Sequence, residues 1–470
     1  MAILSAYMVP HPPLILPEIG KGQEQAIGHT IKAYHEAAQR IGHDQPDTII
    51  LFSPHQIMYS DYFHISPGKG AKGDFARFRA GTVKMEVSYD TDFVQKLCDL
   101  ADLAAFPAGT YGEQNNRLDH GTMVPLYFIN QYWKNYHLVR IGLSGLPLIK
   151  HYEFGRYIKE TVHILGRKAV LIASGDLSHR LKEEGPYGYQ KEGPEYDRRI
   201  MDVMERAAFG ELLDFSEDFC EKAGECGHRS FTIMAGALDE TTLLPKKLSY
   251  EGPFGVGYGI CCYHTAGPDP SRNFQFQYEE KRKTALLQQR EREDGYIRLA
   301  RSTIETYIRT GKIINLPENL DKEMTSQKAG VFVSIKEDGR LRGCIGTIQA
   351  VQDSIAEEII ANAISASTKD PRFSPIEPWE LDRLTISVDV LGGKEKISSP
   401  DQLDPRRYGV IVTKGRKRGL LLPNLEGVDT VEEQIAIAKR KAGIRETEQA
   451  ELERFEVIRH ETQTLNEEGS

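Results

Sequence analysis

Residues 48–55, TIILFSPH, form a run of apolar and β-branched side chains that stops at Ser-Pro-His. A short apolar run closed by a proline-containing turn is typical of a buried strand. The residues that follow such a strand lie at the carboxyl end of a sheet, where open α/β folds bind their ligands. His55 is therefore predicted to lie at a functional edge of the sheet, although a single histidine after a strand is more often structural than a ligand.

The same arrangement occurs earlier in the chain. Residues 3–9, ILSAYMV, are another strand-like run, and they lead into Pro-His-Pro-Pro with His11 at the equivalent place. The neighbouring prolines restrict the backbone around both histidines. Two imidazoles at two strand ends predict a shared metal ion.

Strand-like and helix-like segments alternate through the first half of the chain. Apolar residues between positions 25 and 41 repeat at spacings of three and four, which is the stripe of an amphipathic helix. Further strands are predicted at 137–145 and 168–179, with a helix at 152–165 between them. This alternation predicts an α/β fold with a mostly parallel sheet and helices on both faces. Residues 60–82, rich in Gly, Lys, Arg and aromatic residues, are predicted to be a long surface loop.

Three polar clusters lie at the ends of these predicted elements or between them. His120 precedes Gly-Thr and an apolar run, at a predicted helix start. His179 ends the motif SGDLSH, at the carboxyl end of a predicted strand. The motif GECG places Glu225 and Cys226 between two glycines, which let the backbone turn tightly and direct a side chain into a site.

The chain is long enough for two domains. Its 470 residues exceed what one hydrophobic core normally supports. The polar, proline-containing segment AGPDPSRNFQFQY and the charged residues after it mark the boundary. We expect an N-terminal domain at 1–267, a linker at 268–288, and a smaller α+β domain at 289–462, in which VFVSIKEDGRLRGCIGT reads as a hairpin.

Charge and hydropathy exclude several classes of function. The 59 basic and 68 acidic residues give a net charge of -9, which disfavours nucleic acid as the main partner. No apolar run approaches the ~18 residues that span a bilayer, and the N-terminus lacks the features of a signal peptide. The six cysteines form no C-x-x-C pair, and sparse reduced thiols fit the cytosol. We therefore expect a cytoplasmic protein without a membrane partner.

The order of His11, His55, His120, SGDLSH and GECGHRS along the N-terminal domain resembles that of the class III extradiol ring-cleavage dioxygenases, with the Memo proteins as a related branch. The resemblance implies that His11, His55 and Glu225 hold non-haem Fe(II). It also implies that His179 is the acid/base residue and that His120 lines the substrate site.

Elementary chemistry agrees with that assignment. Two imidazoles and one carboxylate occupy one face of Fe(II) and leave three positions for a catecholate and dioxygen. A nearby histidine can take the second catechol proton and return it, because its pKa lies near neutrality. The expected partners are a small aromatic substrate and dioxygen, and the expected assembly is a homo-oligomer. Zinc or another divalent metal stays open as an alternative to iron.

Two adjacent residues compete for the place of the third ligand. Glu225 and Cys226 do not easily both reach one ion from an extended loop. A carboxylate ligand keeps Fe(II) a hard Lewis acid with open coordination positions. A thiolate ligand suits a softer, redox-oriented or zinc-like site. The dioxygenase branch has Glu here and the Memo branch has Cys before Gly. We predict Glu225, because His120 and His179 would have no obvious role beside a non-catalytic metal. The alternatives are a metal-binding redox or assembly factor without ring cleavage, and a zinc hydrolase.

The C-terminal part resembles the AMMECR family through the motifs LRGCIGT, DPRFSP and GLLLP. The pairing of the two domains resembles the AmmeMemoRadiSam system, which implies a separate radical-SAM protein, since this chain has no C-x-x-x-C-x-x-C motif. Cys344, framed by glycines in the predicted hairpin, is a candidate reactive thiol. Arg342 would stabilise its thiolate. The alternative is that Cys344 is simply a small packed residue.

Overall fold

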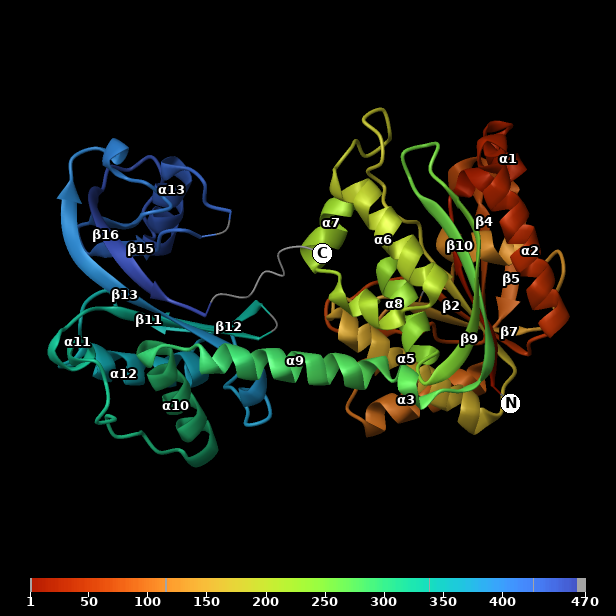
Figure 1. The fold of residues 1–470 in the computed structure, drawn as a ribbon. Helices are drawn as coiled ribbons and strands as arrows, with labels where there is room; N and C mark the ends of the chain where they lie inside the picture. Colours follow the sequence, from red (N-terminus) through yellow and green to blue (C-terminus); the bar gives the residue numbers. More distant parts are fainter. Residues whose placement is uncertain (1, 115, 338, 426, 463–470) are drawn as a thin grey trace. The chain divides into compact units, whose positions relative to one another are not determined.

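The structure is a computed structural model that describes residues 2–114, 116–337, 339–425 and 427–462 (Figure 1). The chain divides into two compact units, Met1–Glu279 and Glu280–Ser470. Helix α9 (Phe274–Glu291) runs across this division, and none of its residues is buried. The polar and charged segment after the first domain therefore forms a solvated helix that joins the two units.

A six-stranded sheet with the order β7-β2-β8-β1-β10-β9 organises the first unit. Four neighbouring strands are parallel, namely β7 (His137–Gly142), β2 (Thr48–Ser53), β8 (Ala169–Ser174) and β1 (Ile3–Val9). Two antiparallel strands extend the sheet, namely β10 (Tyr258–Pro268) and β9 (Thr241–Glu251). Every residue of β2 and β8 is buried, as expected for central strands covered on both faces. The prediction of a mostly parallel α/β sheet is confirmed.

Helices cover both faces of this sheet. Side chains alternate along a strand, so Ile50 and Phe52 join one hydrophobic core while Ile49 and Leu51 join the other. The first core is completed mainly by α3 (Thr91–Leu103), α5 (Leu148–Leu165), α6 (Glu192–Arg206), α7 (Glu217–Ala223) and α8 (His228–Ala237). The second is completed mainly by α2 (Gly28–Asp44) and α4 (His120–Ile129), and the short α1 (Pro17–Gly20) precedes α2.

Helices α5 and α8 approach each other unusually closely. A Cβ atom added at Gly236 would lie 1.9 Å from the carbonyl oxygen of Tyr152, and one added at Gly155 would lie 2.1 Å from that of Ile233. Only glycine at both places allows this contact, because the neighbouring atoms belong to the backbone. The contact fixes α8, whose first turn directly follows the GECG motif.

The segment predicted as a surface loop, residues 60–82, contains strands instead. Strand β4 (Gly70–Phe75) pairs antiparallel with β5 (Ala80–Ser88), and the two-residue strands β3 (Phe63–His64) and β6 (Ala108–Gly109) pair in parallel. The loop prediction was wrong because the interspersed Gly and Lys residues mask a strand pattern in which Ala71 and Phe75 reach the core.

The second unit contains an antiparallel six-stranded sheet with the order β12-β11-β13-β16-β14-β15. Its strands are β11 (Val331–Glu337), β12 (Arg340–Gly346), β13 (Leu384–Ile397), β14 (Tyr408–Lys414), β15 (Lys417–Leu421) and β16 (Glu451–His460). Its helices are α10 (Gly295–Thr310), α11 (Lys322–Ser326), α12 (Ile355–Thr368) and α13 (Val431–Ala442). Strands β11 and β12 pair antiparallel, as predicted for the hairpin, and the α+β class of this domain is confirmed.

Side-chain caps begin the three longer helices of this sheet domain. Asp294, Ser354 and Thr430 each accept a hydrogen bond from a backbone N–H of the first turn of α10, α12 and α13, respectively. Such caps satisfy donors that a helix start leaves without partners. Among the helices in the described ranges, none combines the length and the apolar character needed to cross a membrane.

Candidate metal centre

The predicted histidines gather at one edge of the sheet of the first unit. Strands β2, β8 and β1 are neighbours and parallel, so the residues after their carboxyl ends meet there. The ring centroids of His11 and His55 lie 4.7 Å apart, and those of His55 and His120 lie 3.9 Å apart. The fold thus brings together histidines that are distant in sequence, at the strand ends where the sequence predicted them.

The spacing of three donor atoms fits a single metal ion. His11 Nε2 lies 2.9 Å from His55 Nε2 and 3.6 Å from Cys226 Sγ, and one possible ligand atom from each residue falls within a common 4.8 Å limit. A tetrahedral ion with metal–nitrogen bonds of about 2.1 Å and a metal–sulfur bond of about 2.3 Å would place such donors about 3.3–3.6 Å apart. To bind an ion in this way, the Nε2 atoms of His11 and His55 would have to move apart by only a few tenths of an ångström.

Hydrogen bonds fix which nitrogen of His11 faces the site. Ser174 Oγ donates its only proton to the carbonyl oxygen of Gly121 at 2.6 Å, so it must accept from His11 Nδ1, which lies 2.9 Å away. The lone pair of His11 is therefore on Nε2, toward His55 and Cys226. Burial lowers the pKa of His11 well below its usual value, and the His55 ring lowers it further. A neutral imidazole oriented by a hydroxyl is the form that binds metals.

Two glycines let the Cys226 loop approach the end of β8. A Cβ atom added at Gly175 would lie 2.1 Å from Gly227 Cα. The backbone N–H of Asp176 then donates to Cys226 Sγ at 3.2 Å, which holds the sulfur beside His11. Burial first, and then the carboxylates of Asp176 and Glu225, raise the pKa of the Cys226 thiol well above its usual value. Metal binding there would release a proton.

Glu225 has a different position from the one predicted. Its Oε2 accepts a hydrogen bond from the backbone N–H of His228 at 2.5 Å, in the first turn of α8. Burial raises the pKa of Glu225 to about 7, against the opposing effect of that hydrogen bond. The sequence favoured Glu225 as the third donor, and the structure brings Cys226 to the histidines instead, because α8 uses the neighbouring carboxylate at its N-terminus.

His120 and His179 flank the three donors. His120 is the first residue of α4, and its ring stacks at an angle on that of His55. Burial and the nearby His55 lower the pKa of His120 to about 3, so the ring is neutral. His179 Nε2 is buried and has no hydrogen-bond partner among the described residues, while its ring stacks on Tyr187. Their assignments as substrate-lining and acid/base residues stay predictions.

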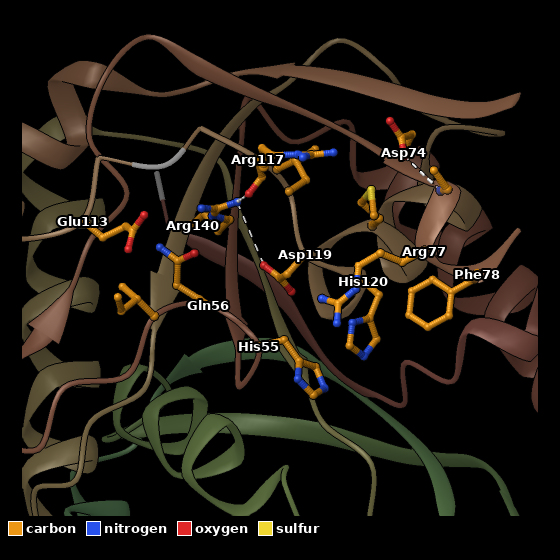
Figure 2. A pocket seen from close by; sticks show the side chains of 14 residues that line it. His55, Gln56, Asp74, Arg77, Phe78, Glu113, Arg117, Asp119, His120 and Arg140 are labelled. Atoms are coloured by element: carbon orange, nitrogen blue, oxygen red, sulfur yellow. Dashed lines mark hydrogen bonds and ion pairs between the residues drawn. The ribbon is translucent and has the colours of Figure 1, made fainter. Parts of the chain in front are cut away.

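A cavity of about 520 Å³ opens beside the histidines (Figure 2). His55 and His120 form part of its wall, together with Asp119 and Arg140. Asp119 accepts hydrogen bonds from Ser53 Oγ and from the N–H and hydroxyl of Thr122. Although burial raises the pKa of Asp119, Arg140 and these donors bring it below its usual value.

Sequence reasoning did not single out Asp119 and Arg140, although each left a signal. Asp119 directly precedes the apolar run of α4 and caps that helix, which is the ordinary pattern of a helix start. Arg140 is a charged residue inside the apolar strand β7, and its side chain is only 2% exposed. A charge within a buried strand is rarely present without a partner, and it therefore indicates a polar site.

The predicted pair Arg342 and Cys344 is not coupled as expected. Arg342 Nε forms an ion pair with Glu380 at 2.6 Å, and its Nη1 donates to the carbonyl of Ser374. The thiol of Cys344 accepts from Ser334 Oγ at 3.3 Å. The guanidinium of Arg342 is committed to the DPRFSP segment and to Glu380, so the proposed activation of Cys344 by Arg342 has no support in the structure.

Comparisons with known proteins also divide the chain into an N-terminal and a C-terminal domain. Residues 5–261 match the family described as the catalytic LigB subunit of aromatic ring-opening dioxygenase, and residues 297–464 match AMMECR1. Protein CA_C1420 from Clostridium acetobutylicum is 42% identical over 468 residues, which cover 98% of this chain and 99% of that protein. A Thermotoga maritima protein is 50% identical over 170 residues, which cover 36% of this chain and 98% of that protein.

The uncharacterized protein PH0010 from Pyrococcus horikoshii, whose crystal structure is known, matches 35% of this chain and 88% of its own chain. Its sequence identity is 35% and its TM-score 0.33. The LigB match spans more than half of the 470 residues, and the Clostridium relative extends over nearly the whole length of both chains. The chain therefore belongs to the family of the catalytic LigB subunit of aromatic ring-opening dioxygenase, and it carries an AMMECR1 domain after that subunit-like domain.

Proposed function

We propose that the N-terminal domain is a metal-dependent redox domain in which His11, His55 and Cys226 hold one transition-metal ion. The observation that supports this proposal is the convergence of their donor atoms within 4.8 Å. Two imidazoles and one thiolate suit copper, zinc or iron. Bound there, such an ion would supply Lewis-acid and, for copper or iron, one-electron chemistry.

The surrounding residues supply orientation and access. Ser174 holds the His11 ring, and the Asp176 N–H stabilises the sulfur of Cys226. Three protein donors leave a coordination position open, and the adjacent cavity gives a small molecule access to it. His179 Nε2, which has no hydrogen-bond partner among the described residues, would exchange a proton with that molecule.

Ring cleavage of a catechol-type substrate with dioxygen is the second candidate. It is favoured by the 520 Å³ cavity, which is large enough for a single substituted ring, and by the family description. In this candidate Fe(II) would be held by His11, His55 and Glu225. The carboxylate of Glu225 would then have to leave the N–H of His228 and turn toward the histidines.

Metal binding by two matched variants separates the candidates. Full-length wild-type protein, Cys226→Ser and Glu225→Gln would be loaded anaerobically with Fe(II) and, separately, with Co(II). We expect Cys226→Ser to lose metal and the sulfur-to-cobalt absorption band, because the thiolate is a ligand. Glu225→Gln should keep both, since glutamine can still accept from His228. Loss of metal in Glu225→Gln, with retention in Cys226→Ser, would establish the carboxylate site and overturn the thiolate proposal.

A substrate assay then addresses the chemistry. The iron-loaded wild-type protein would be mixed with a set of catechols under air while absorbance of yellow ring-opened products is recorded. The redox proposal predicts no such product. Stoichiometric yellow product with dioxygen uptake would replace it with the ring-cleavage candidate.

A further inference from the structure

The backbone beside His179 is held firmly by the fold. The N–H of Ser178 donates to Asp197 at 2.8 Å, and its carbonyl oxygen accepts from the N–H of Gly257 at 2.9 Å. The N–H of Arg180 donates to Ser178 Oγ at 3.0 Å. The chain on both sides of His179 is therefore fixed, and only the torsion angles of the side chain are left to place its ring.

No hydrogen bond orients this ring. His179 Nε2 is buried, and the ring has no hydrogen-bond partner among the described residues. His11 shows the more usual arrangement, since the Ser174 hydroxyl contacts its Nδ1 and so fixes its ring. The orientation of the His179 ring must therefore come from packing against a neighbouring side chain.

The ring of Tyr187 supplies such a contact. The ring centroids of Tyr187 and His179 lie 5.1 Å apart, and the ring planes are inclined by 28°, so the two rings are stacked. Tyr187 is 62% exposed, and its hydroxyl has no hydrogen-bond partner within the part of the chain that the structure describes. The contact is thus made by the face of an aromatic ring and does not depend on the hydroxyl.

The loop that carries Tyr187 is anchored to the turn between β9 and β10. Leu181 and Tyr189 form an antiparallel bridge near the two ends of the loop, and the N–H of Leu181 donates to the carbonyl oxygen of Gly255 at 3.1 Å. A Cβ atom added at Gly255 would lie 3.0 Å from Gly185 Cα, so the loop and the turn meet backbone to backbone. Tyr187 therefore projects from a fixed backbone, although its side chain is exposed.

The His179 ring lies within electrostatic reach of the metal centre. Burial lowers the pKa of His179, while Asp176 raises it and His55 lowers it. Asp176 also accepts a hydrogen bond from the backbone N–H of His11 at 2.7 Å. The imidazole is thus close to the groups around the candidate donors, whereas its stacking partner Tyr187 is open to solvent.

From these contacts we infer that Tyr187 is a positioning residue, whose ring holds the imidazole of His179 with its Nε2 buried beside the metal centre. The inference rests on the proposed function, since it concerns the histidine that would exchange a proton there. Tyr187 itself would touch neither the metal nor the bound molecule and would act only through His179. A proton-transfer group that is already oriented does not have to be ordered during the reaction.

Nuclear magnetic resonance of the full-length protein without added metal tests the stack directly. Histidine would be labelled with 13C at Cε1, and the His179 signal would be identified by its absence in His179→Gln. In the wild type we expect one sharp His179 signal, displaced by the ring current of Tyr187. Tyr187→Ala should lose this displacement. Tyr187→Phe should keep it, because a phenyl ring stacks in the same way.

Modification by diethyl pyrocarbonate gives a second readout on the same variants. The buried Nε2 of His179 reacts only when the ring swings outward, and the stack opposes that motion. We expect His179 to react roughly two- to tenfold faster in Tyr187→Ala, the factor that corresponds to the loss of one aromatic stack. Tyr187→Phe should react at the wild-type rate. The exposed His163 provides an internal reference whose rate stays constant, with peptide mass spectrometry as the measurement.

Tyr189→Ala is the matched control, because Tyr189 is an exposed tyrosine of the same loop, at 44% exposure. It should leave the His179 signal and its reactivity as they are in the wild type. Equal changes in Tyr189→Ala and Tyr187→Ala would assign the effect to the loop as a whole and overturn the inference. An unaltered His179 signal in Tyr187→Ala, or a Tyr187→Phe variant that behaves like Tyr187→Ala, would overturn it too.

Cobalt binding by the same samples separates this inference from the function on which it rests. Tyr187→Ala should bind Co(II) as the wild type does, since Tyr187 contacts none of the three donors. Loss of Co(II) in this variant would show that Tyr187 supports the metal centre and does not act through His179 alone. Wild-type protein that binds no Co(II) would overturn the proposed function, whereas failure of the stack alone would be visible in the metal-free spectra.

Discussion

The hydroxyl of Ser174 determines which ring nitrogen of His11 carries its proton and which faces the metal centre. Its proton goes to the carbonyl of Gly121, which leaves its oxygen as an acceptor for His11 Nδ1. Without that acceptor the ring could flip its protonated nitrogen toward Cys226. Ser174, which would not itself contact the metal, therefore selects the tautomer of His11, which would bind it.

Replacing this hydroxyl should weaken metal binding without removing a ligand. We expect Ser174→Ala to lower metal affinity about 10- to 100-fold, the usual effect of losing such a supporting hydrogen bond. Competition with a chelator of known affinity would measure the change. Ser88→Ala, an exposed position on β5, serves as the control and should bind metal as the wild type does. Equal affinity in Ser174→Ala would show that the tautomer is fixed by another contact.

A buried acid on α6 should make the stability of the first unit depend on pH. Burial raises the pKa of Asp197 to about 7, although Ser178 N–H and Tyr250 hydroxyl donate to it. Because the folded state holds this proton more tightly than the unfolded state, the stabilising contribution is complete below about pH 4. It is lost as the pH rises through about 7.

Asp197→Asn should remove that dependence, since its amide oxygen can still accept from the Ser178 N–H and its amide NH2 can donate to the Tyr250 hydroxyl, while the side chain carries no charge. We expect the decrease in unfolding free energy between pH 5 and pH 8 to shrink by roughly 2 kcal/mol, as followed by chemical denaturation. Asp202→Asn, an exposed change on the same helix, should leave the decrease almost as it is in the wild type. A decrease of unaltered size in Asp197→Asn would contradict the assigned pKa.

At the scale of elements, the close approach of two backbones brings Cys226 to the end of β8. Gly175→Ala should force apart the strand end and the loop, because the new Cβ would meet backbone atoms that cannot rotate away. We expect a loss of about 1–3 kcal/mol in stability together with a loss of metal binding. Thermal unfolding and metal content would be measured on the same samples.

Gly28→Ala provides the matched comparison, since a Cβ at this position of α2 meets no atom within 4 Å. This variant should keep its metal and its stability, or gain slightly in stability. If Gly175→Ala behaved like Gly28→Ala, the tight approach would not be what places the cysteine.

Which elements could be predicted depended on where their apolar residues lie. Strands β1, β2 and β8 are mostly apolar runs, so both they and the histidines after them could be found from the sequence. The hairpin of β4 and β5 could not, because its buried side chains alternate with glycines and charges. That Cys226 rather than Glu225 lies beside the histidines could not be predicted either, since it depends on contacts between α8, α5 and β8 that are remote in sequence.

At the scale of the whole molecule, α9 is the expected point of cleavage between the two units. None of its residues is buried, so local opening exposes its backbone easily. We expect brief trypsin digestion to cut within residues 280–291, at the Lys and Arg residues there, and to leave two fragments near the sizes of the units. Mass spectrometry would identify the cut, and the N-terminal fragment should retain the metal. Early cleavage before residue 274 or after residue 291 would contradict this view.

The candidate donors of the metal centre are distant from one another in the sequence of the first unit. His11 and Cys226 are 215 positions apart along the chain. In an unfolded chain the closure of a loop this long costs entropy, so folding would bring these donors together before they bind one ion. Under the proposed function, a metal ion would therefore bind after the sheet has formed, and it would stabilise only the folded domain.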